Sequence, residues 1–341
     1  GLHRRRRTGL NQVKVGLVGV GHLGKLHLKS WLAFPKIEVA GVYDIDPAKT
    51  RGVAADFGVP AAASFEELVE KSEAVDLVTP TVTHFELGKR ILEAGRNLFV
   101  EKPLTSYVDE AEKLIEISEI TGRLLFIGHI ERFNPAFEKL LSFSPQPLFI
   151  EVHRLASFSP RNLDVDVVLD LMIHDIDLVL KLVKSKPVEV RSSLAPVLSA
   201  QPDIANARIL FENGCVANLT ASRISVAKMR KFRLFQKEAY FSVDLLEKNL
   251  EAYVLLPNAS HIPAEELVRL PLSFGERAIA MTQFSPTAES DMLTAELSEF
   301  VAACQKKATP RVTSEDALEA VRLAQKVTKA GLTSLAVLQN A

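Results

Sequence analysis

The 341-residue sequence predicts an α/β protein, with a doubly wound parallel sheet in its N-terminal part and a C-terminal α+β domain built on a large, mostly antiparallel open sheet. Three observations support this. From Val13 to about Gly128, short apolar segments alternate with amphipathic ones, which is typical of a parallel sheet covered on both faces. After Gly128, strand-like segments follow one another with few helices between them. The length also exceeds what one core of ~250–300 residues usually holds.

The N-terminal half alternates strand and helix in a regular order. Each expected strand is a short apolar run, and each expected helix repeats apolar residues three or four positions apart. Pro47 follows Asp46 and suits the first turn of a helix. We expect strands at Val13–Gly19, Ile37–Tyr43, Val75–Val78, Asn97–Val100 and Leu124–Ile127. We expect helices at His22–Phe34, from Asp46, from Ser64, at Phe85–Ala94 and at Val108–Thr121.

The C-terminal half is richer in strands. Asn213-Gly214 lies between two of them and predicts a type I′ hairpin turn. We expect strands at Leu148–His153, Val188–Leu194, Ala205–Phe211, Val216–Ala221, Lys231–Phe235, Ala239–Val243 and Ala252–Leu256. We expect helices at Phe133–Leu141, Val167–Val183, Ser290–Lys306 and Ser314–Ala330. Helices on one side leave the other sheet face open, and Leu210 on that face favours a homodimer or homotetramer.

Composition and charge restrict the domains and the partners. We expect a flexible basic arm at residues 1–10, a first domain at 11–128, and at 129–341 a second domain for substrate binding and oligomerisation, with the C-terminal helices. An apolar fraction of 47% and a charged fraction of 24% exclude a disordered chain. The net charge is −1 although it includes Arg4–Arg7, which argues against nucleic acid as a partner.

The cysteines and the hydropathy indicate the compartment. Cys215 and Cys304 are the two cysteines of the sequence, and no CxxC motif is present. This excludes a disulfide framework and favours the reducing cytoplasm. No apolar run reaches the ~18 residues of a membrane span, and no apolar segment follows the N-terminal arginines as it would in a secretion signal.

A glycine motif marks a dinucleotide site. The segment Gly19-Val20-Gly21-His22-Leu23-Gly24 follows an expected strand and opens an expected helix, which is the context of the Rossmann fingerprint. Gly19 allows the tight turn, Gly21 lets the backbone approach a pyrophosphate, and Gly24 lets helix and strand pack closely. His22 and Leu23 belong to the same helix N-terminus, which attracts phosphate. We expect all five residues to line the cofactor.

An acidic residue selects between the two dinucleotides. Asp44 follows Gly24 by about 20 residues and ends the second strand, where its carboxylate can accept hydrogen bonds from the ribose hydroxyls. It would repel a 2′-phosphate, so NAD is favoured over NADP. Lys49 and Arg51 are near enough in sequence to leave NADP open. The alternative is a glycine turn without a ligand and an aspartate that caps a helix.

Two further motifs carry acid–base groups. Lys102 ends a parallel strand, the edge where ligands bind in such sheets, and Pro103 restricts its backbone. Asp170 and His174 are four residues apart, on one face of a largely apolar helix. The alternatives are a solvated lysine and a surface ion pair. A metal site that adds His129 lacks any further ligand spacing, so we expect no metal.

Together these motifs identify a family. The Gly19–Gly24 turn, Glu101-Lys102-Pro103 and the Asp170…His174 pair resemble the Gfo/Idh/MocA oxidoreductases. The resemblance implies an N-terminal Rossmann domain and an open C-terminal sheet that often forms the subunit interface. It also implies that Lys102 and His174 flank the reacting alcohol, that Asp170 assists, and that Glu101 binds near the nicotinamide ribose.

The segment Pro80-Thr81-Val82-Thr83-His84 resembles the loop beside the nicotinamide in that family. The resemblance implies that Pro80, Thr81 and His84 contact the cofactor. The alternative is an ordinary strand-to-helix turn with Thr83 as its cap.

A narrower resemblance concerns the substrate. The segments Gly128–Pro135 and Asp166–Asp177 look like the UDP-N-acetylglucosamine 3-dehydrogenase branch of the family, which implies a nucleotide sugar oxidised at C3 on the way to lipid A, with an aminotransferase downstream. Arg132, Arg154 and Arg161 are candidates to hold the diphosphate, and surface arginines are the alternative.

The sequence leaves two questions open. Lys102 needs a lowered pKa to accept the hydroxyl proton, whereas His174 titrates near neutrality, and the pattern does not choose between them. The rival functions are a dehydrogenase of a free polyol or monosaccharide, a non-catalytic NAD-binding regulator, and an enzyme that reduces imines or double bonds.

Overall fold

The computed structural model describes residues 12–35, 37–159, 165–256, 267–268, 278–286 and 291–339. The chain divides into two compact units, which are described separately. The first unit draws on Gly1–Lys102, Glu112–Gly128 and Leu293–Pro310, and the second on Pro103–Ala111, His129–Met292 and Arg311–Ala341. A helix from near the C-terminal end of the sequence therefore belongs to the same unit as the glycine motif.

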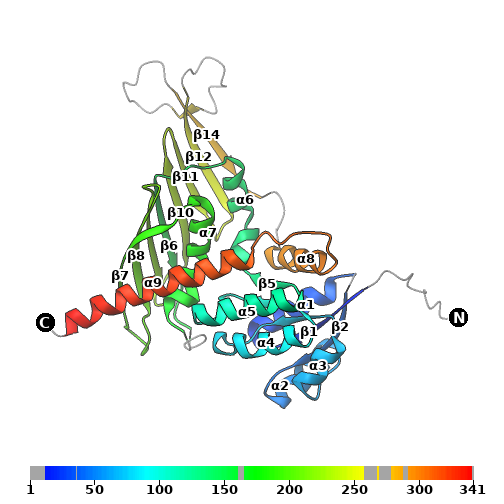
Figure 1. The fold of residues 1–341 in the computed structure, drawn as a ribbon. Helices are drawn as coiled ribbons and strands as arrows, with labels where there is room; N and C mark the ends of the chain where they lie inside the picture. Colours follow the sequence, from blue (N-terminus) through cyan, green and yellow to red (C-terminus); the bar gives the residue numbers. More distant parts are fainter. Residues whose placement is uncertain are drawn as a thin grey trace. The chain divides into compact units, whose positions relative to one another are not determined.

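The first unit contains a five-stranded parallel sheet in the order β2-β1-β3-β4-β5. Figure 1 labels β1, β2 and β5 of this sheet. Its strands are β1 (Val13–Val18), β2 (Ile37–Tyr43), β3 (Ala74–Leu77), β4 (Asn97–Glu101) and β5 (Leu125–Gly128). The strand order changes direction next to β1, and ligands bind at the carboxyl ends of strands at such a switch point. This is the Rossmann sheet that the strand–helix alternation predicts.

Helices cover both faces of this sheet. They are α1 (His22–Ala33), α2 (Pro47–Phe57), α3 (Phe65–Lys71), α4 (His84–Glu93), α5 (Val108–Thr121), of which Glu112 onward belongs to this unit, and α8 (Met292–Cys304). Successive side chains of β4 point to opposite faces of the sheet. Phe99 packs edge-on against Phe300 of α8, at a centroid distance of 5.5 Å, whereas Leu98 lies beside Gly88 of α4. Among the described residues, no helix is long and apolar enough to cross a membrane.

The second unit contains a nine-stranded sheet in the order β13-β14-β12-β11-β10-β6-β9-β8-β7. All neighbours are antiparallel except β6 and β9. The strands are β6 (Phe149–Leu155), β7 (Pro187–Ala195), β8 (Ile204–Phe211), β9 (Val216–Ser222), β10 (Met229–Gln236), β11 (Ala239–Asp244), β12 (Asn249–Leu256), β13 (Leu267–Val268) and β14 (Ala278–Phe284).

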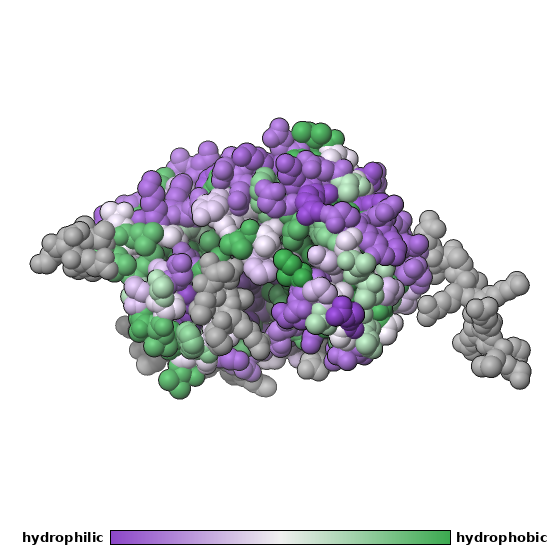
Figure 2. Space-filling model, turned by 90° about the horizontal axis from the view of Figure 1, so that it is seen from below, coloured by the Kyte–Doolittle hydropathy of each residue, from purple (hydrophilic) through white to green (hydrophobic). Residues whose placement is uncertain are grey.

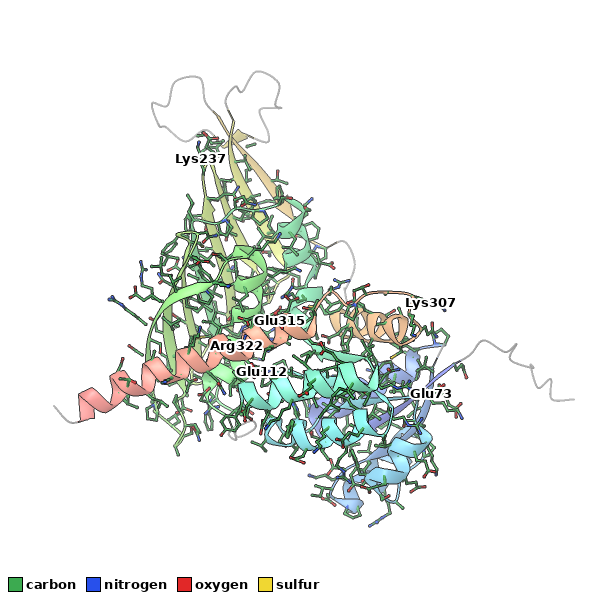
Figure 3. All side chains as sticks on the ribbon, in the orientation of Figure 1. Glu73, Glu112, Lys237, Lys307, Glu315 and Arg322 are labelled. Carbon is green, nitrogen blue, oxygen red and sulfur yellow. The ribbon has the colours of Figure 1, made fainter. Side chains whose placement is uncertain are left out.

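The helices of the second unit are α6 (Pro135–Ser142), α7 (Ile173–Val183) and α9 (Ser314–Gln339). Ile176 and Val179 of α7 are fully buried in one hydrophobic core with Val152 and Leu219 of the sheet. Side chains fill the space between this sheet and the helices (Figure 3). The same figure labels Lys237, in the turn between β10 and β11.

The structure corrects three local predictions. Asn213 has no positive φ, so the β8–β9 connection is not type I′; Gly214 alone is left-handed, with φ +85°. The helix expected from Phe133 begins at Pro135, because Asn134 caps it by accepting from the backbone N–H of Ala136. The helix expected at Val167–Val183 starts with a π-helical segment, Val168–Met172.

Candidate active site

The glycine turn between β1 and α1 has the shape that a dinucleotide requires. Gly19 has φ +93°, and a Cβ there would lie 2.2 Å from the carbonyl oxygen of Val78. A Cβ on Gly24 would lie 2.0 Å from the carbonyl oxygen of Gly19. A Cβ on Gly21 would meet nothing within 4 Å, so this backbone faces open space. Two glycines are therefore needed for packing, and the third leaves room for a pyrophosphate.

Asp44 stands beside this turn. Its Oδ2 accepts from the backbone N–H of Val20 at 3.1 Å, and its Oδ1 accepts from that of Asp46 at 3.0 Å. Thr50 also accepts from the backbone N–H of Asp44 at 2.9 Å. The carboxylate is thus held at the end of β2 next to the glycine turn, where the fingerprint requires an acid. His22 and Leu23, the first residues of α1, are exposed.

The segment after β3 forms a short 3-10 turn, Thr81–Thr83, that leads into α4. Pro80 is exposed, whereas Thr81 and His84 are buried. The Nε2 of His84 bonds to the carbonyl oxygen of Thr79 at 3.0 Å. Thr83 does not cap α4 with its side chain; its hydroxyl lies 2.7 Å from the carbonyl oxygen of Pro80 and 2.8 Å from the hydroxyl of Thr79. These bonds give the loop one defined conformation.

Glu101 is the last residue of β4, Lys102 follows it, and Glu101 lies next to a group of buried charged side chains. The Glu101 side chain is almost buried, and its Oε1 lies 3.1 Å from Nε2 of His27. Its Oε2 accepts from the backbone N–H of Lys102 at 3.2 Å. Burial acts to raise the pKa of Glu101, but His27 and then Lys102 outweigh it, so the pKa is lowered. Glu101 is therefore ionised, and the side chain of Lys102 is half-buried.

In the second unit, Asp170 lies in the π-helical segment and His174 in the first turn of α7. Both are half-buried. Nη1 of Arg223 lies 4.0 Å from Oδ2 of Asp170 and donates to the carbonyl oxygen of Val165 at 2.9 Å. π-Helical turns are frequent at functional sites. The sequence analysis missed Arg223, since nothing in the local pattern of β9 distinguishes it from a surface arginine.

Buried ion pairs connect the Gly128–Pro135 segment to this helix. Arg132 donates two hydrogen bonds to Asp177, at 2.6 and 2.7 Å, and both side chains are buried. Arg154 in β6 donates to Asp175 at 2.8–3.0 Å and to Glu131 at 2.9 Å. The two candidate phosphate arginines thus have internal carboxylate partners that the sequence analysis did not predict.

Arg161, the third candidate for the diphosphate, lies outside the described residues. Within the described part of the chain, no group of three or more His, Cys, Asp or Glu side chains is placed to hold a metal ion. His129 is buried, with its Nδ1 3.8 Å from Oδ2 of Asp177.

The sequence analysis also missed the buried charged residues around Glu101, which are His27, Asp76 and Glu296. Asp76 is fully buried in β3, where its Oδ2 accepts from Nδ1 of His27 at 2.9 Å and from Nε1 of Trp31 at 2.6 Å. A carboxylate inside the apolar run Val75–Val78 was the available signal, because a buried charge requires a partner. Glu296 of α8 gave no comparable signal, since its helix is distant in sequence.

Comparisons with known proteins agree with this geometry. Residues 13–129 match a family model described as "Oxidoreductase family, NAD-binding Rossmann fold", and residues 147–242 match "GFO/IDH/MocA C-terminal domain". The chain is 39% identical over 242 residues to UDP-N-acetylglucosamine 3-dehydrogenase from Acidithiobacillus ferrooxidans, covering 71% of this chain and 77% of that protein. It is 27% identical over 196 residues to inositol 2-dehydrogenase from Rhizobium meliloti, covering 54% and 59%.

Solved structures give the same result. That of the A. ferrooxidans UDP-N-acetylglucosamine 3-dehydrogenase GnnA matches with a TM-score of 0.82 and 32% identity, over 94% of this chain and 98% of the other. The glycine turn, the acid at the end of β2, the two family models and this similarity over both units lead to one conclusion. The chain belongs to the Gfo/Idh/MocA family and is an NAD-dependent oxidoreductase.

Proposed function

We propose that this oxidoreductase oxidises the C3 hydroxyl of UDP-N-acetylglucosamine to a ketone. The 39% identity to an enzyme of that name over 77% of its length is the observation that carries the proposal. The bonds formed and broken are simple: the C3 hydrogen leaves as a hydride, and the hydroxyl proton leaves to a base. Bound NAD supplies the hydride acceptor.

Three residues of the chain take the proton and hold the alcohol in this proposal. Lys102 and His174 are the candidate proton acceptors, and Asp170 orients the imidazole. In the reverse direction a protonated Lys102 polarises the ketone. Glu101, ionised and nearly buried, binds the nicotinamide ribose, while the loop from Pro80 to His84 contacts the nicotinamide.

Ion pairs join the two segments that carry the resemblance to the substrate branch. The segments Gly128–Pro135 and Asp166–Asp177 are distant in sequence. An ion pair between Arg132 and Asp177 nevertheless joins them. Arg154 joins both segments through Glu131 and Asp175. Arg132 and Arg154 therefore stabilise the substrate unit internally, and Arg161 remains the proposed ligand of the diphosphate.

The decisive experiment measures NADH formation with UDP-N-acetylglucosamine, with free N-acetylglucosamine and myo-inositol in parallel. A glutamate-dependent aminotransferase is added to consume the ketone, because oxidation of a secondary alcohol by NAD is uphill at neutral pH. We expect turnover with the nucleotide sugar alone. Equal turnover with inositol would favour the polyol reaction, which the 27% identity to inositol 2-dehydrogenase supports as the second candidate. A chain that binds NAD but turns over no substrate would favour a regulator.

We propose lipid A biosynthesis as the pathway and the cytoplasm as the compartment. The pathway rests on the resemblance to the UDP-N-acetylglucosamine branch. The compartment rests on the cysteines: Cys215 and Cys304 are both free, which suits a reducing environment. An aminotransferase that consumes the ketone is the partner that this pathway requires.

We also propose that the chain forms a homo-oligomer through the open face of the second sheet. Four aromatic rings follow one another across this face, on neighbouring strands: Phe149, Phe235, Tyr240 and Tyr253, with centroid distances of 5.9, 4.8 and 5.7 Å. Phe235 remains 39% exposed. Figure 2 shows the molecule from below, where hydrophobic residues are also exposed among hydrophilic ones. Aromatic rings on a sheet face that no helix covers are typical of an interface. A monomeric mass in light scattering at micromolar concentration would contradict the proposal.

A further inference from the structure

A cluster of buried charges lies beneath Glu101 and is not used by the proposed reaction. His27 of α1, Asp76 of β3 and Glu296 of α8 are each fully buried in the first unit. The Nδ1 of His27 bonds to Asp76 at 2.9 Å, and its Nε2 lies 3.1 Å from Glu101. Two helices and one strand that are distant in sequence therefore bring these three side chains together near Glu101.

The arrangement defines the charge of the imidazole. The ring has a carboxylate near each nitrogen: Nδ1 hydrogen-bonds to Asp76, whereas Nε2 lies 3.1 Å from Glu101, an ion-pair contact without hydrogen-bond geometry. Two flanking anions stabilise the charged form of the ring. Burial alone lowers the pKa of His27, but Asp76 and Glu101 together raise it well above its ordinary value. His27 is therefore a buried cation between two anions.

Glu296 completes the charge balance by remaining neutral. Within the part of the chain that the structure describes, neither of its carboxyl oxygens has a hydrogen-bond partner, although the side chain is fully buried. Burial, followed by the negative charge of Glu101, raises the pKa of Glu296 well above its ordinary value. A third carboxylate in this cluster would compete with Glu101 for His27, so the protonated form of Glu296 preserves the His27–Glu101 pair.

We propose that His27 is a positioning residue for the cofactor: as a buried imidazolium that bridges Asp76 and Glu101, it holds the Glu101 carboxylate ionised and oriented toward the nicotinamide ribose. Oε1 of Glu101 is oriented by His27, and Oε2 by the backbone N–H of Lys102. The inference rests on the proposed cofactor contact of Glu101, and it is independent of which sugar is oxidised.

The first test uses the unmodified protein. Nitrogen-15 NMR distinguishes the imidazolium from the neutral ring. The His27 signal is assigned through its contacts with the flanking ring of Phe99, whose centroid is 5.7 Å away, and with Trp31, which shares Asp76. We expect His27 to keep both protons at pH 8.5. A neutral His27 ring at pH 7 would overturn the inference without any variant.

The second test is a double-mutant cycle read out by NAD affinity. We expect His27→Gln and Glu101→Gln each to weaken NAD binding about tenfold, and the double variant to bind as weakly as Glu101→Gln alone, because His27 acts through Glu101. Lys29→Gln is the matched control: it removes one exposed cation from the same helix, and NAD affinity is expected to stay within about twofold.

The outcomes separate this inference from the proposed function. Losses that multiply in the double variant, or an unchanged Kd in His27→Gln, would overturn the positioning role, since a merely structural histidine lowers the melting temperature without coupling to Glu101. If His27→Gln does not fold, the NMR result alone decides. A chain that shows the coupling but oxidises no UDP-sugar would retain the inference and lose the proposed substrate.

Discussion

Each compact unit buries a network of charged side chains, and the two networks differ in chemistry. In the first unit, the imidazole of His27 lies among Asp76, Glu101 and the neutral Glu296. In the second unit, guanidinium groups pair with carboxylates, as in Arg154 with Asp175. In the first network, the carboxyl group of Glu296 has no hydrogen-bond partner among the described residues, whereas the guanidinium of Arg154 donates to two carboxylates.

The difference shows what each network can do. An arginine keeps its charge at any physiological pH, so the second network is a permanent scaffold. Asp175 and Glu131 reinforce this: burial lowers the pKa of Arg154, but these two carboxylates raise it above its ordinary value. Histidine and glutamate can change charge, so the first network can affect cofactor binding and its pH dependence. Substitutions in the first network are therefore expected to act through charge and pH, and those in the second network through the stability of the fold.

The largest effect is expected at Lys102. Lys102→Ala should reduce hydride transfer by about 10²–10⁴-fold, because it removes a group that transfers or stabilises the proton. NAD affinity should change little, since the side chain acts on the substrate. Stopped-flow NADH formation and NAD titration measure the two quantities. Lys113→Ala, which removes an exposed lysine from α5, is the control, and full turnover in Lys102→Ala would make the lysine a bystander.

Breaking the second network should lower stability instead. Arg154→Met removes the guanidinium that bonds to buried Asp175 and Glu131, and Arg230 stays 3.2 Å from Glu131. We expect a cost of about 3–5 kcal/mol in the free energy of unfolding, because Asp175 stays buried after it loses this guanidinium. Urea unfolding measures this cost. The matched control is Arg233→Met in β10, whose partner Glu151 is also at the surface, so about 0–1 kcal/mol is expected. Equal costs for the two variants would contradict the contrast between buried and exposed pairs.

Glu296 should make the stability of the first unit depend on pH. The pKa of Glu296 is raised above the ordinary 4.5 in the folded chain. At pH values between the ordinary and the folded pKa, the folded chain therefore keeps a proton that the unfolded chain releases. The stabilisation is complete below the ordinary pKa and is lost as the pH rises toward the folded value, by up to about 1.4 kcal/mol per pH unit. The Glu296→Gln variant has no carboxyl group at this position, so its free energy of unfolding does not fall with pH for this reason.

We therefore expect Glu296→Gln to be more stable than the natural chain at pH 8, with the difference shrinking toward pH 4.5. Unfolding free energies at a series of pH values measure it, with Glu93→Gln on exposed α4 as the control. A pH-independent difference would show that Glu296 is ionised in the folded protein, and the first network would then resemble the second.

The smallest effect is expected at Asp44. The natural chain should bind NAD more tightly than NADP, and Asp44→Ala should narrow that preference by about tenfold, because the carboxylate no longer repels a 2′-phosphate. Titration of both cofactors measures it. Equal affinities in the natural chain would remove this role from Asp44 and leave it as a residue that orders the backbone of Val20 and Asp46.

The local features of the first unit were predictable because they depend on neighbouring residues. Strand–helix alternation predicts the parallel sheet, and the spacing of Gly19, Gly21 and Gly24 predicts the turn after β1. Position 44 follows from the length of one helix and one strand. The same local reasoning misjudged Asn213-Gly214, because backbone angles in a hairpin also depend on the pairing of its strands.

The pairing of distant side chains was not predictable in this way. Residue spacing indicated that Asp170 and His174 share a helix, but it could not show the π-helical turn or Arg223 beside it. Arg132 was a candidate for phosphate, yet its bidentate partner is Asp177, 45 residues away. β14 also went unrecognised, since its pairing with β12 crosses a long connection.

The amino-acid order alone therefore predicted the Rossmann sheet, the glycine turn and the acid beside that turn, and it supplied the residue types proposed for acid–base chemistry. These follow from steric limits and hydrogen bonding within a few turns of chain. The fold alone established which charges are buried together, because burial and Coulomb interactions depend on distances through space. Glu296 illustrates the division: in the sequence it is an ordinary helical glutamate, and only the packing of α8 beside β4 makes it a buried, protonated neighbour of Glu101.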